Sequence, residues 1–255
     1  MLTAANLEGL SVVRHGFFTR AGGVSEGEFA SLNCGYSSGD DVARVETNRE
    51  RSLESLGMPP ASLCTVRQVH GAHVVIAPQP QPGRPTVRAD ALVAARPGIA
   101  LGVLCADCAP VLLVDPEARV IGAAHAGWRG ALAGVIEATV GAMVGLGALQ
   151  SRIRAAIGPC IAQRSYEVGP ELLEEFTDED PGCADLFEPV DGSDRLRFDL
   201  KGYVLTRLAR AGIEERAALP HDTHADEARF FSARRTRQRG RERFGLLLSA
   251  IALVD

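Results

Sequence analysis

Four short apolar runs follow one another in the middle of the chain, and they constrain the fold more than any other feature. They span residues 91–93, 100–104, 111–114 and 120–124. Apolar runs of this length are typical of strands that are buried within a sheet. Such strands need partners from elsewhere in the chain, so the sequence predicts a sheet assembled from distant segments.

Further strands and helices are expected around these four runs. Strands are predicted at 12–19, 63–69, 74–76, 153–157 and 246–253, and helices at 42–56, 132–144, 170–176 and 200–211. The first helix has Asp40 or Asp41 as its N-cap and ends at Gly57. This mixture predicts an α+β fold, with mixed β-sheets and surrounding helices.

The segment Pro78–Pro85 carries four prolines in eight residues. Proline has no backbone N–H to donate to a strand partner, so this segment is expected to be an exposed loop. The apolar strands after it need sheet partners from elsewhere in the chain. We therefore interpret residues 1–255 as one domain rather than two domains joined by a linker.

Composition and charge narrow the classes of partner. The 255 residues are 46% hydrophobic and 23% charged, and the formal net charge is -5. A net negative charge favours neither nucleic acid nor an anionic membrane as partner, so a small molecule is expected. The first 25 residues do not resemble a signal peptide, and no apolar run reaches the length of a membrane span, so a cytoplasmic location is expected. There the six cysteines would remain thiols, available for metal or nucleophile chemistry.

Two histidines stand in contexts that favour a functional role. His70 ends an expected strand and precedes Gly71, which allows a ligand or another backbone to approach closely. His125 follows the apolar run 120–124 and opens a glycine-containing turn into a helix. Both side chains are therefore expected at the rim of a sheet.

Cys105 and Cys108 form a C-x-x-C pair between two apolar runs. A structural zinc site needs a second such pair, and the sequence has none. In an extended backbone, residues three apart point to opposite faces, so the two thiols are not expected to share one ion. Cys108, beside Asp107 and Pro110, is better placed at a sheet edge than Cys105. Combined with the two histidines, it suits either a histidine-activated thiolate or a metal held by two nitrogens and one sulfur.

Several segments of the chain, taken in order, resemble the motifs of a known protein family. Its ordered motifs are similar to those of the YfiH or laccase-domain family, which is also labelled multicopper polyphenol oxidase-like or purine nucleoside phosphorylase-like. The matching segments are Leu32-Asn33-Cys34-Gly35, Gln68-Val69-His70-Gly71, Ala106-Asp107-Cys108-Ala109-Pro110, His125-Ala126-Gly127-Trp128-Arg129-Gly130, Ile157-Gly158-Pro159-Cys160-Ile161 and Phe230-Phe231-Ser232-Ala233-Arg234-Arg235. One departure is Asp222-Thr223-His224, where the family often has Cys-Thr-aromatic.

The resemblance implies a zinc ion bound by His70, Cys108 and His125, with copper as an alternative metal. It implies a purine nucleoside phosphorylase, with adenosine deamination and methylthioadenosine cleavage as associated activities. The motifs also imply a set of substrate-binding residues, which are Asn33, Gln68, Arg129, Phe231, Arg234 and Arg235. The family fold has been compared with cysteine hydrolases of a bacterial toxin, so a cysteine hydrolase acting on a cell-wall precursor is another alternative.

Each of these activities requires particular side chains, and the sequence can be checked for them. A laccase needs a cluster of three coppers held mainly by histidines, and six histidines without any H-x-H pair argue against it. Phosphorolysis needs an anion site, for which Arg129 is the first candidate and Arg234 or Arg235 the second. Deamination needs an acid or base near a metal-bound water, for which Asp107 is the candidate. A non-enzymatic, zinc-braced binding module would need a fourth ligand to close the site, so an enzyme is favoured.

Overall fold

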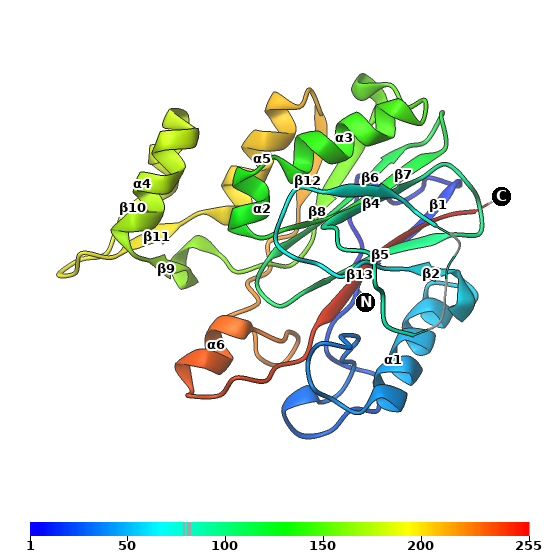
Figure 1. Cartoon of the computed structure of the whole chain (residues 1–255), viewed down its shortest axis with the longest axis horizontal. Coiled ribbons are helices and arrows are strands. Elements are labelled where there is room, and N and C mark those ends of the chain that lie inside the picture. Colours follow the sequence, from blue (N-terminus) through cyan, green and yellow to red (C-terminus); the bar gives the residue numbers. More distant parts are fainter. Residues whose placement is uncertain (79, 81–82, 255) are drawn as a thin grey trace.

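The computed structural model of the chain describes residues 1–78, 80 and 83–254. Two β-sheets pack against each other at its centre, and helices cover their outer faces (Figure 1). A third, smaller sheet lies to one side. The mixed sheets and surrounding helices predicted from the sequence are therefore confirmed.

The larger sheet has six strands and mixed directions. Its edge strands run parallel to their neighbours, whereas the four inner strands are antiparallel. In spatial order the strands are β12 (Glu215–Ala218), β8 (Arg154–Ile157), β6 (Ala109–Asp115), β7 (Val120–Ala126), β4 (Ala91–Ala94) and β3 (Val74–Ile76).

The second sheet joins the two ends of the chain to its middle. β13 pairs antiparallel with both β1 and β5, and the short β2 runs parallel to β5. In spatial order its strands are β1 (Val13–Phe17), β13 (Leu247–Leu253), β5 (Ala100–Cys105) and β2 (Leu63–Cys64). The sheet thus depends on pairing between residues far apart in the sequence.

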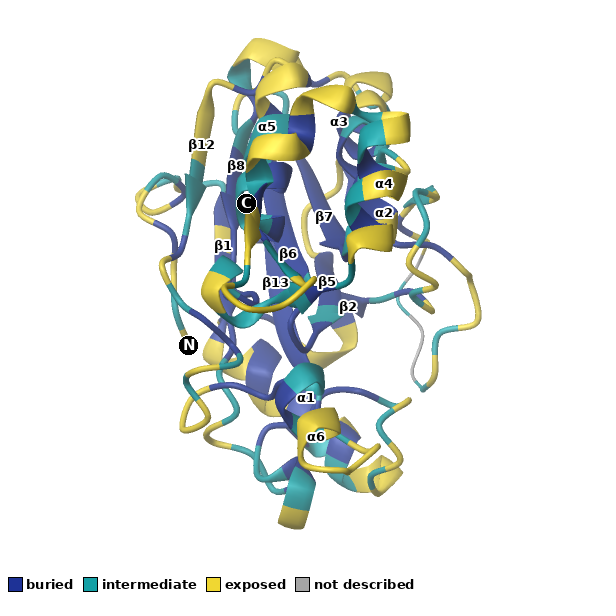
Figure 2. Ribbon diagram, turned by 90° about the vertical axis from the view of Figure 1, so that its left-hand side faces the viewer, coloured by how far each residue is buried: buried dark blue, intermediate teal, exposed yellow. Residues whose placement is uncertain are grey.

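Alternating side chains of the strands fill two separate cores. In β6, Leu112 and Val114 pack into the core between the two sheets, whereas Val111 and Leu113 pack toward the helices. Helices α3 (Val135–Gly145) and α5 (Leu200–Arg210) cover this outer face. Helix α1 (Val42–Ser55) covers the second sheet through a further apolar cluster. Figure 2 shows the buried strands inside and exposed residues on the helices.

The third sheet is held by aromatic side chains. It contains β10 (Phe187–Pro189), β11 (Leu196–Phe198) and β9 (Glu167–Val168), and α4 (Pro170–Glu179) packs beside it. Phe176 of α4 lies 4.7 Å from Phe198 and 4.9 Å from Tyr203 between ring centroids, in edge-to-face contacts. Tyr166, which directly precedes β9, lines the cavity described below.

The remaining elements are short. They are α2 (Trp128–Leu132), α6 (Ala233–Gln238) and the 3-10 turns Gly27–Phe29, Pro60–Ser62, Gln150–Arg152, Gln163–Ser165 and Pro181–Leu186. In the described part of the chain, no helix is long and apolar enough to cross a membrane.

Most of the predicted strands and helices are present, but two predictions are wrong in detail. The strand expected at 63–69 pairs only at Leu63–Cys64, with an isolated bridge at Arg67. Beyond it, the Gln68 side chain takes the place of a strand, because its amide donates to the Leu104 carbonyl (2.7 Å) and accepts from the Leu104 N–H (2.8 Å). The helix expected at 132–144 is broken at Gly134, whose φ is 91°.

Three further outcomes concern individual segments. Asp41, one of the two expected N-caps, accepts a hydrogen bond from the Arg44 N–H. The proline-rich loop expected at 78–85 lies partly outside the described residues, and its described members are in neither a helix nor a strand. β9, β10, β11, β12 and α6 were not predicted, because each is only two to six residues long and carries little periodicity.

The break between α2 and α3 gives a stability prediction. Gly134→Ala should lower the free energy of unfolding by about 1 kcal/mol, since alanine is strained at a positive φ. The space itself is sufficient, because an added Cβ would meet its nearest atom at 3.5 Å. Gly141→Ala is the matched control. It lies inside α3 with nothing within 4 Å of an added Cβ and should instead stabilise by about 0.5–1 kcal/mol.

Chemical denaturation of the two variants and the wild type measures both effects. Equal changes in the two variants, or stabilisation by Gly134→Ala, would contradict the assignment of a left-handed break at Gly134.

Candidate metal centre

Three neighbouring strands of the six-stranded sheet bring the candidate residues to one edge. Cys108 immediately precedes β6, and His125 of β7 is the register partner of Pro110 in β6. Asp90 immediately precedes β4, which lies on the other side of β7 and pairs Ala91 with Ala124. The same end of β4, β7 and β6 therefore carries a carboxylate, an imidazole and a thiol side by side.

The Asp90 carboxylate organises this edge. It is fully buried and accepts hydrogen bonds from the backbone N–H groups of Val69 (3.1 Å), His70 (2.9 Å) and Gly71 (2.7 Å). It also bonds to Nδ1 of His125 at 2.9 Å. One side chain thus fixes the loop that carries His70 and orients the ring of His125, leaving its Nε2 to face the site. His70 itself adopts a φ of 61°, a left-handed conformation held by these bonds.

The donor atoms of His70, Cys108 and His125 lie close enough together to hold one metal ion. All three are within 4.8 Å of one another, and Nε2 of His70 is 3.9 Å from Sγ of Cys108. Tetrahedral zinc at about 2.0–2.1 Å from nitrogen and about 2.3 Å from sulfur has ligand atoms roughly 3.3–3.6 Å apart. A small inward shift of the side chains would therefore satisfy such an ion, with a fourth position left for another ligand.

Two glycines allow this close approach. A Cβ on Gly127 would lie 3.0 Å from both Sγ of Cys108 and Cδ2 of His70. A Cβ on Gly130 would lie 2.8 Å from the carbonyl oxygen of Gly71. The glycines of the turn into α2 are thus required because the helix start packs directly against the donors and their loop.

Cys108 and His125 form a charged pair. Burial raises the pKa of Cys108, but the imidazoles of His125 and His70 outweigh it and lower that pKa to about 6. Burial lowers the pKa of His125, while the Cys108 thiolate and the Asp90 carboxylate outweigh it and raise that pKa to about 9. Cys108 is therefore a thiolate at neutral pH, the form in which cysteine binds metals and acts as a nucleophile.

Cys105 is separated from Cys108, but not by the extended backbone that the sequence suggested. Asp107 has a φ of 91°, and the residues between the two cysteines turn the chain from one sheet into the other. Cys105 ends β5 in the four-stranded sheet and is 3% exposed, and burial raises its pKa well above the usual value. The thiol of Cys105 is accordingly part of the core.

The Asp107 carboxylate is engaged in hydrogen bonds with other groups of the protein. Its carboxylate accepts hydrogen bonds from the Thr223 hydroxyl (2.7 Å), the Ser232 hydroxyl (2.9 Å) and the Arg234 N–H (2.7 Å). These bonds join the turn before β6 to the start of α6. The carboxylate therefore serves to position α6.

A cavity of about 1090 Å³ opens over the three donors. Two arginines in its wall rest on aromatic rings. The Arg129 guanidinium lies 4.1 Å above the Trp128 ring, and that of Arg234 lies 5.1 Å from the Tyr166 ring. Burial raises the pKa of Tyr166, and the Cys108 thiolate raises it further, so its hydroxyl remains protonated.

The other predicted substrate-binding residues divide into two groups. Gln68 lines the cavity, whereas Asn33, Phe231 and Arg235 are buried outside its lining. Asn33 holds the 35–40 loop, since its amide donates to Ser38 (2.8 Å) and its carbonyl accepts from the Gly35 N–H (3.0 Å). The structure thus brings Gln68, Arg129 and Arg234 to the cavity.

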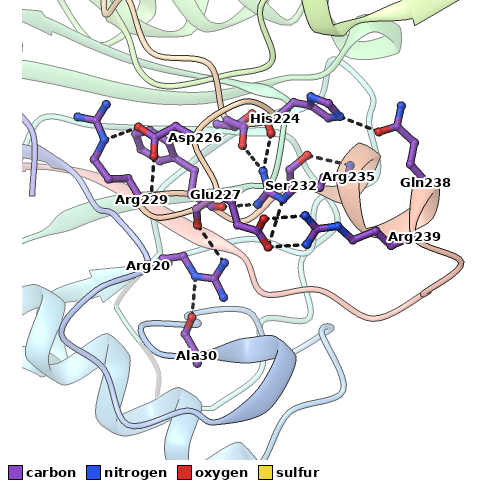
Figure 3. Close-up of polar contacts among 12 residues, drawn as sticks. Arg20, Ala30, His224, Asp226, Glu227, Arg229, Ser232, Arg235, Gln238 and Arg239 are labelled. Atoms are coloured by element: carbon purple, nitrogen blue, oxygen red, sulfur yellow. Dashed lines mark hydrogen bonds and ion pairs between the residues drawn. The ribbon is translucent and has the colours of Figure 1, made fainter.

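Arg235 belongs to a polar network that braces α6 (Figure 3). It donates to the carbonyls of His224 (2.7 Å) and Phe230 (2.6 Å). Glu227 accepts two hydrogen bonds from Arg239, at 2.5 and 2.7 Å, and its carbonyl accepts from Arg20 at 3.2 Å. The network fixes α6 and thereby the position of its cavity-facing Arg234.

Sequence reasoning missed Asp90, Trp128 and Tyr166. An acidic residue directly before a buried apolar strand was a usable signal for Asp90, because a carboxylate at the rim of a sheet needs donors. Trp128 lay within a recognised motif but was given no role. For Tyr166 we find no signal, since it precedes a two-residue strand.

Comparison with known proteins gives consistent matches. The sequence model of the multi-copper polyphenol oxidoreductase laccase family matches residues 14–253. A Streptomyces griseus protein named purine nucleoside phosphorylase is 45% identical over 88% of this chain and 90% of its own length. A Deinococcus radiodurans protein of the same name is 42% identical, over 92% and 87% of the two chains.

Solved structures agree with the sequence matches. The Bacillus licheniformis protein YfiH has a TM-score of 0.86 and 29% identity, covering 94% of this chain and 92% of its own. YlmD from Geobacillus stearothermophilus has a TM-score of 0.84 and 30% identity, covering 99% and 94%. The resemblance inferred from the motifs is confirmed.

The thiolate gives a prediction for the metal-free protein. After treatment with a chelator, alkylation of Cys108 by iodoacetamide should have its half-maximal rate near pH 6, because the neighbouring imidazoles stabilise the thiolate. The control is Cys108→Ser, which should lose the fast-reacting thiol. The other cysteines are buried with raised pKa values. A midpoint near the ordinary value of about 8.5, or fast labelling in Cys108→Ser, would contradict this assignment.

Proposed function

We propose that this chain, which belongs to the multi-copper polyphenol oxidoreductase laccase family, is a zinc-dependent purine nucleoside phosphorylase acting on inosine and adenosine. One observation carries the proposal. The His70, Cys108 and His125 donors open into a cavity whose wall also presents Arg129 and Arg234, both stacked on aromatic rings. The names of the Streptomyces and Deinococcus relatives support the same activity.

The donor set favours zinc as the metal. Two imidazoles and one thiolate with a free fourth position are typical of catalytic zinc sites, whereas structural sites are closed by a fourth protein ligand. Copper(II) binds the same donors strongly and is the alternative occupant. A laccase, however, also needs a separate three-copper cluster. In the part of the chain that the structure describes, this is the only group of three or more metal-ligating side chains.

The two aromatic-stacked arginines support an anion site for phosphate. Neither Arg129 nor Arg234 lies within ion-pair distance of a carboxylate among the described residues. Arg234 donates to the Glu167 carbonyl (2.7 Å), which does not neutralise its charge, so both positive charges are available to a ligand. Guanidinium groups bind phosphate through paired, charge-assisted hydrogen bonds.

The bonds formed and broken in phosphorolysis balance without any further reactant besides phosphate and the nucleoside. A phosphate oxygen bonds to C1′ of the ribose, the bond from C1′ to the purine nitrogen breaks, and the purine takes the electron pair and a proton. Arg129 and Arg234 orient the phosphate, and the protonated Tyr166 hydroxyl can donate a hydrogen bond in the cavity. Zinc, when bound, supplies a Lewis acid beside these groups.

The structure does not favour deamination to the same degree. That reaction needs a free acid or base, and the Asp107 carboxylate proposed for it from the sequence already accepts three hydrogen bonds. We therefore keep phosphorolysis as the proposed reaction.

The reaction itself is the first test. The zinc-loaded protein should release hypoxanthine from inosine only when inorganic phosphate is present, with ribose 1-phosphate as the second product. Chromatography of both products against phosphate concentration measures this. Base release that is independent of phosphate, or no release, would contradict phosphorolysis.

Arg129→Ala tests the anion site. The exposed guanidinium donates to no protein group among the described residues, so its removal should raise the KM for phosphate about tenfold or more and leave stability nearly unchanged. Arg44→Ala is the control, because Arg44 is a partly exposed arginine of α1 outside the cavity lining and forms an ion pair with Glu26. An unaltered KM for phosphate would remove Arg129 from the anion site, and a strongly destabilised variant with unaltered phosphate dependence would show that Arg129 is structural.

A further inference from the structure

The cavity contains more positive charge than inorganic phosphate requires. Besides Arg129 and Arg234, its lining includes four other arginines, which are Arg67, Arg84, Arg237 and Arg243. Among the described residues, the acidic members of the lining are only Asp107 and Glu242. This concentration is local, because the whole chain has a net charge of -5.

The protein does not neutralise three of these four arginines. Arg243 lies 3.5 Å from Glu28 and donates to the Gly39 carbonyl. Within the described residues, Arg67, Arg84 and Arg237 have no carboxylate within 4.0 Å. Like charges collected in one cavity repel one another, and an anionic ligand would relieve this repulsion.

One of the three unpaired arginines lies beside an aromatic ring. The Arg237 guanidinium lies 5.8 Å from the Phe244 ring, which also lines the cavity. Tyr36 lines it too and has Arg49 packed on its ring at 4.8 Å. Arg237 is thus associated with a ring rather than with a carboxylate, like Arg129 and Arg234.

Arg67 connects this second group to the metal centre. Its N–H donates to the Val87 carbonyl at 2.8 Å, so it lies beside the segment that carries Arg84. Three residues after Arg67, the chain reaches the candidate ligand His70. Between them, Gln68 is fixed to Leu104 by two hydrogen bonds. The two parts of the cavity are therefore joined by a short and well-anchored segment.

We propose that Arg67, Arg84 and Arg237 form a second anion subsite, which binds a phosphoryl group carried by the substrate itself. The substrate class is then purine nucleoside 5′-monophosphates, with inorganic phosphate bound separately at Arg129 and Arg234. The binding preference stands alone, while its catalytic consequence rests on the proposed phosphorolysis. In that reaction the C1′–purine bond is replaced by a C1′–phosphate bond, the purine leaves with the proton, and ribose 1,5-bisphosphate forms.

Calorimetric titration of the zinc-loaded protein with inosine and with inosine 5′-monophosphate tests the subsite. The monophosphate should bind at least tenfold more tightly than inosine. The triple variant Arg67→Ala, Arg84→Ala, Arg237→Ala should abolish this preference and leave inosine affinity within about twofold. Arg129→Ala should retain the preference, because the 5′-phosphoryl group does not use that side chain.

A charge-matched triple variant is the control. Arg44→Ala, Arg51→Ala, Arg96→Ala removes the same formal charge from exposed or partly exposed positions outside the cavity lining and should retain the preference. Equal affinity for the two ligands, no binding of either, or the same loss in both triple variants would overturn the subsite. Preferential binding without phosphate-dependent base release would instead leave the subsite intact and refute the proposed phosphorolysis.

Discussion

The buried carboxylate of Asp90 is the interaction on which the rest of the site depends. A fully buried charge is tolerated only when donors surround it, and Asp90 collects three backbone N–H groups and the imidazole of His125. These bonds hold His70 in its left-handed conformation and turn Nε2 of His125 toward Cys108. Two of the three candidate ligands are thus placed by one residue, and the third follows from the register of β6 and β7.

The sheets supply rigidity at this edge, and the surrounding loops supply charge. Cys108 directly precedes β6 and His125 lies near the end of β7, whereas the arginines of the cavity come from α2, from α6 and from the loops that carry Arg67, Arg84 and Arg243. Arg129 and Arg234 rest on aromatic rings instead of carboxylates, so their charges remain available to a ligand. A chain with a net charge of -5 therefore carries a cationic cavity next to a thiolate and two imidazoles.

The sequence predicted the central strands because even short apolar runs carry a strong local signal. It singled out His70, Cys108 and His125 through their neighbours and the family motifs, and the structure brings their donor atoms together. It did not predict the role of Asp90, since the partners of that carboxylate come from a loop about twenty residues earlier and from β7. It was also wrong about the strand at 63–69, where the Gln68 side chain replaces backbone pairing. Arg235 and Phe231 lay in a recognised motif, yet they are buried around the cavity wall. A motif shows which residues gather, not which of them face the ligand.

We propose that His70, Cys108 and His125 together hold one zinc ion. Substitution of each cysteine of the C-x-x-C pair tests this most directly. Elemental analysis of purified protein should give about one zinc per chain in the wild type and in Cys105→Ser, because Cys105 is a core side chain of the other sheet. Cys108→Ser should lose most of the metal, since serine removes the thiolate ligand. Loss of zinc in Cys105→Ser together with full retention in Cys108→Ser would contradict the account.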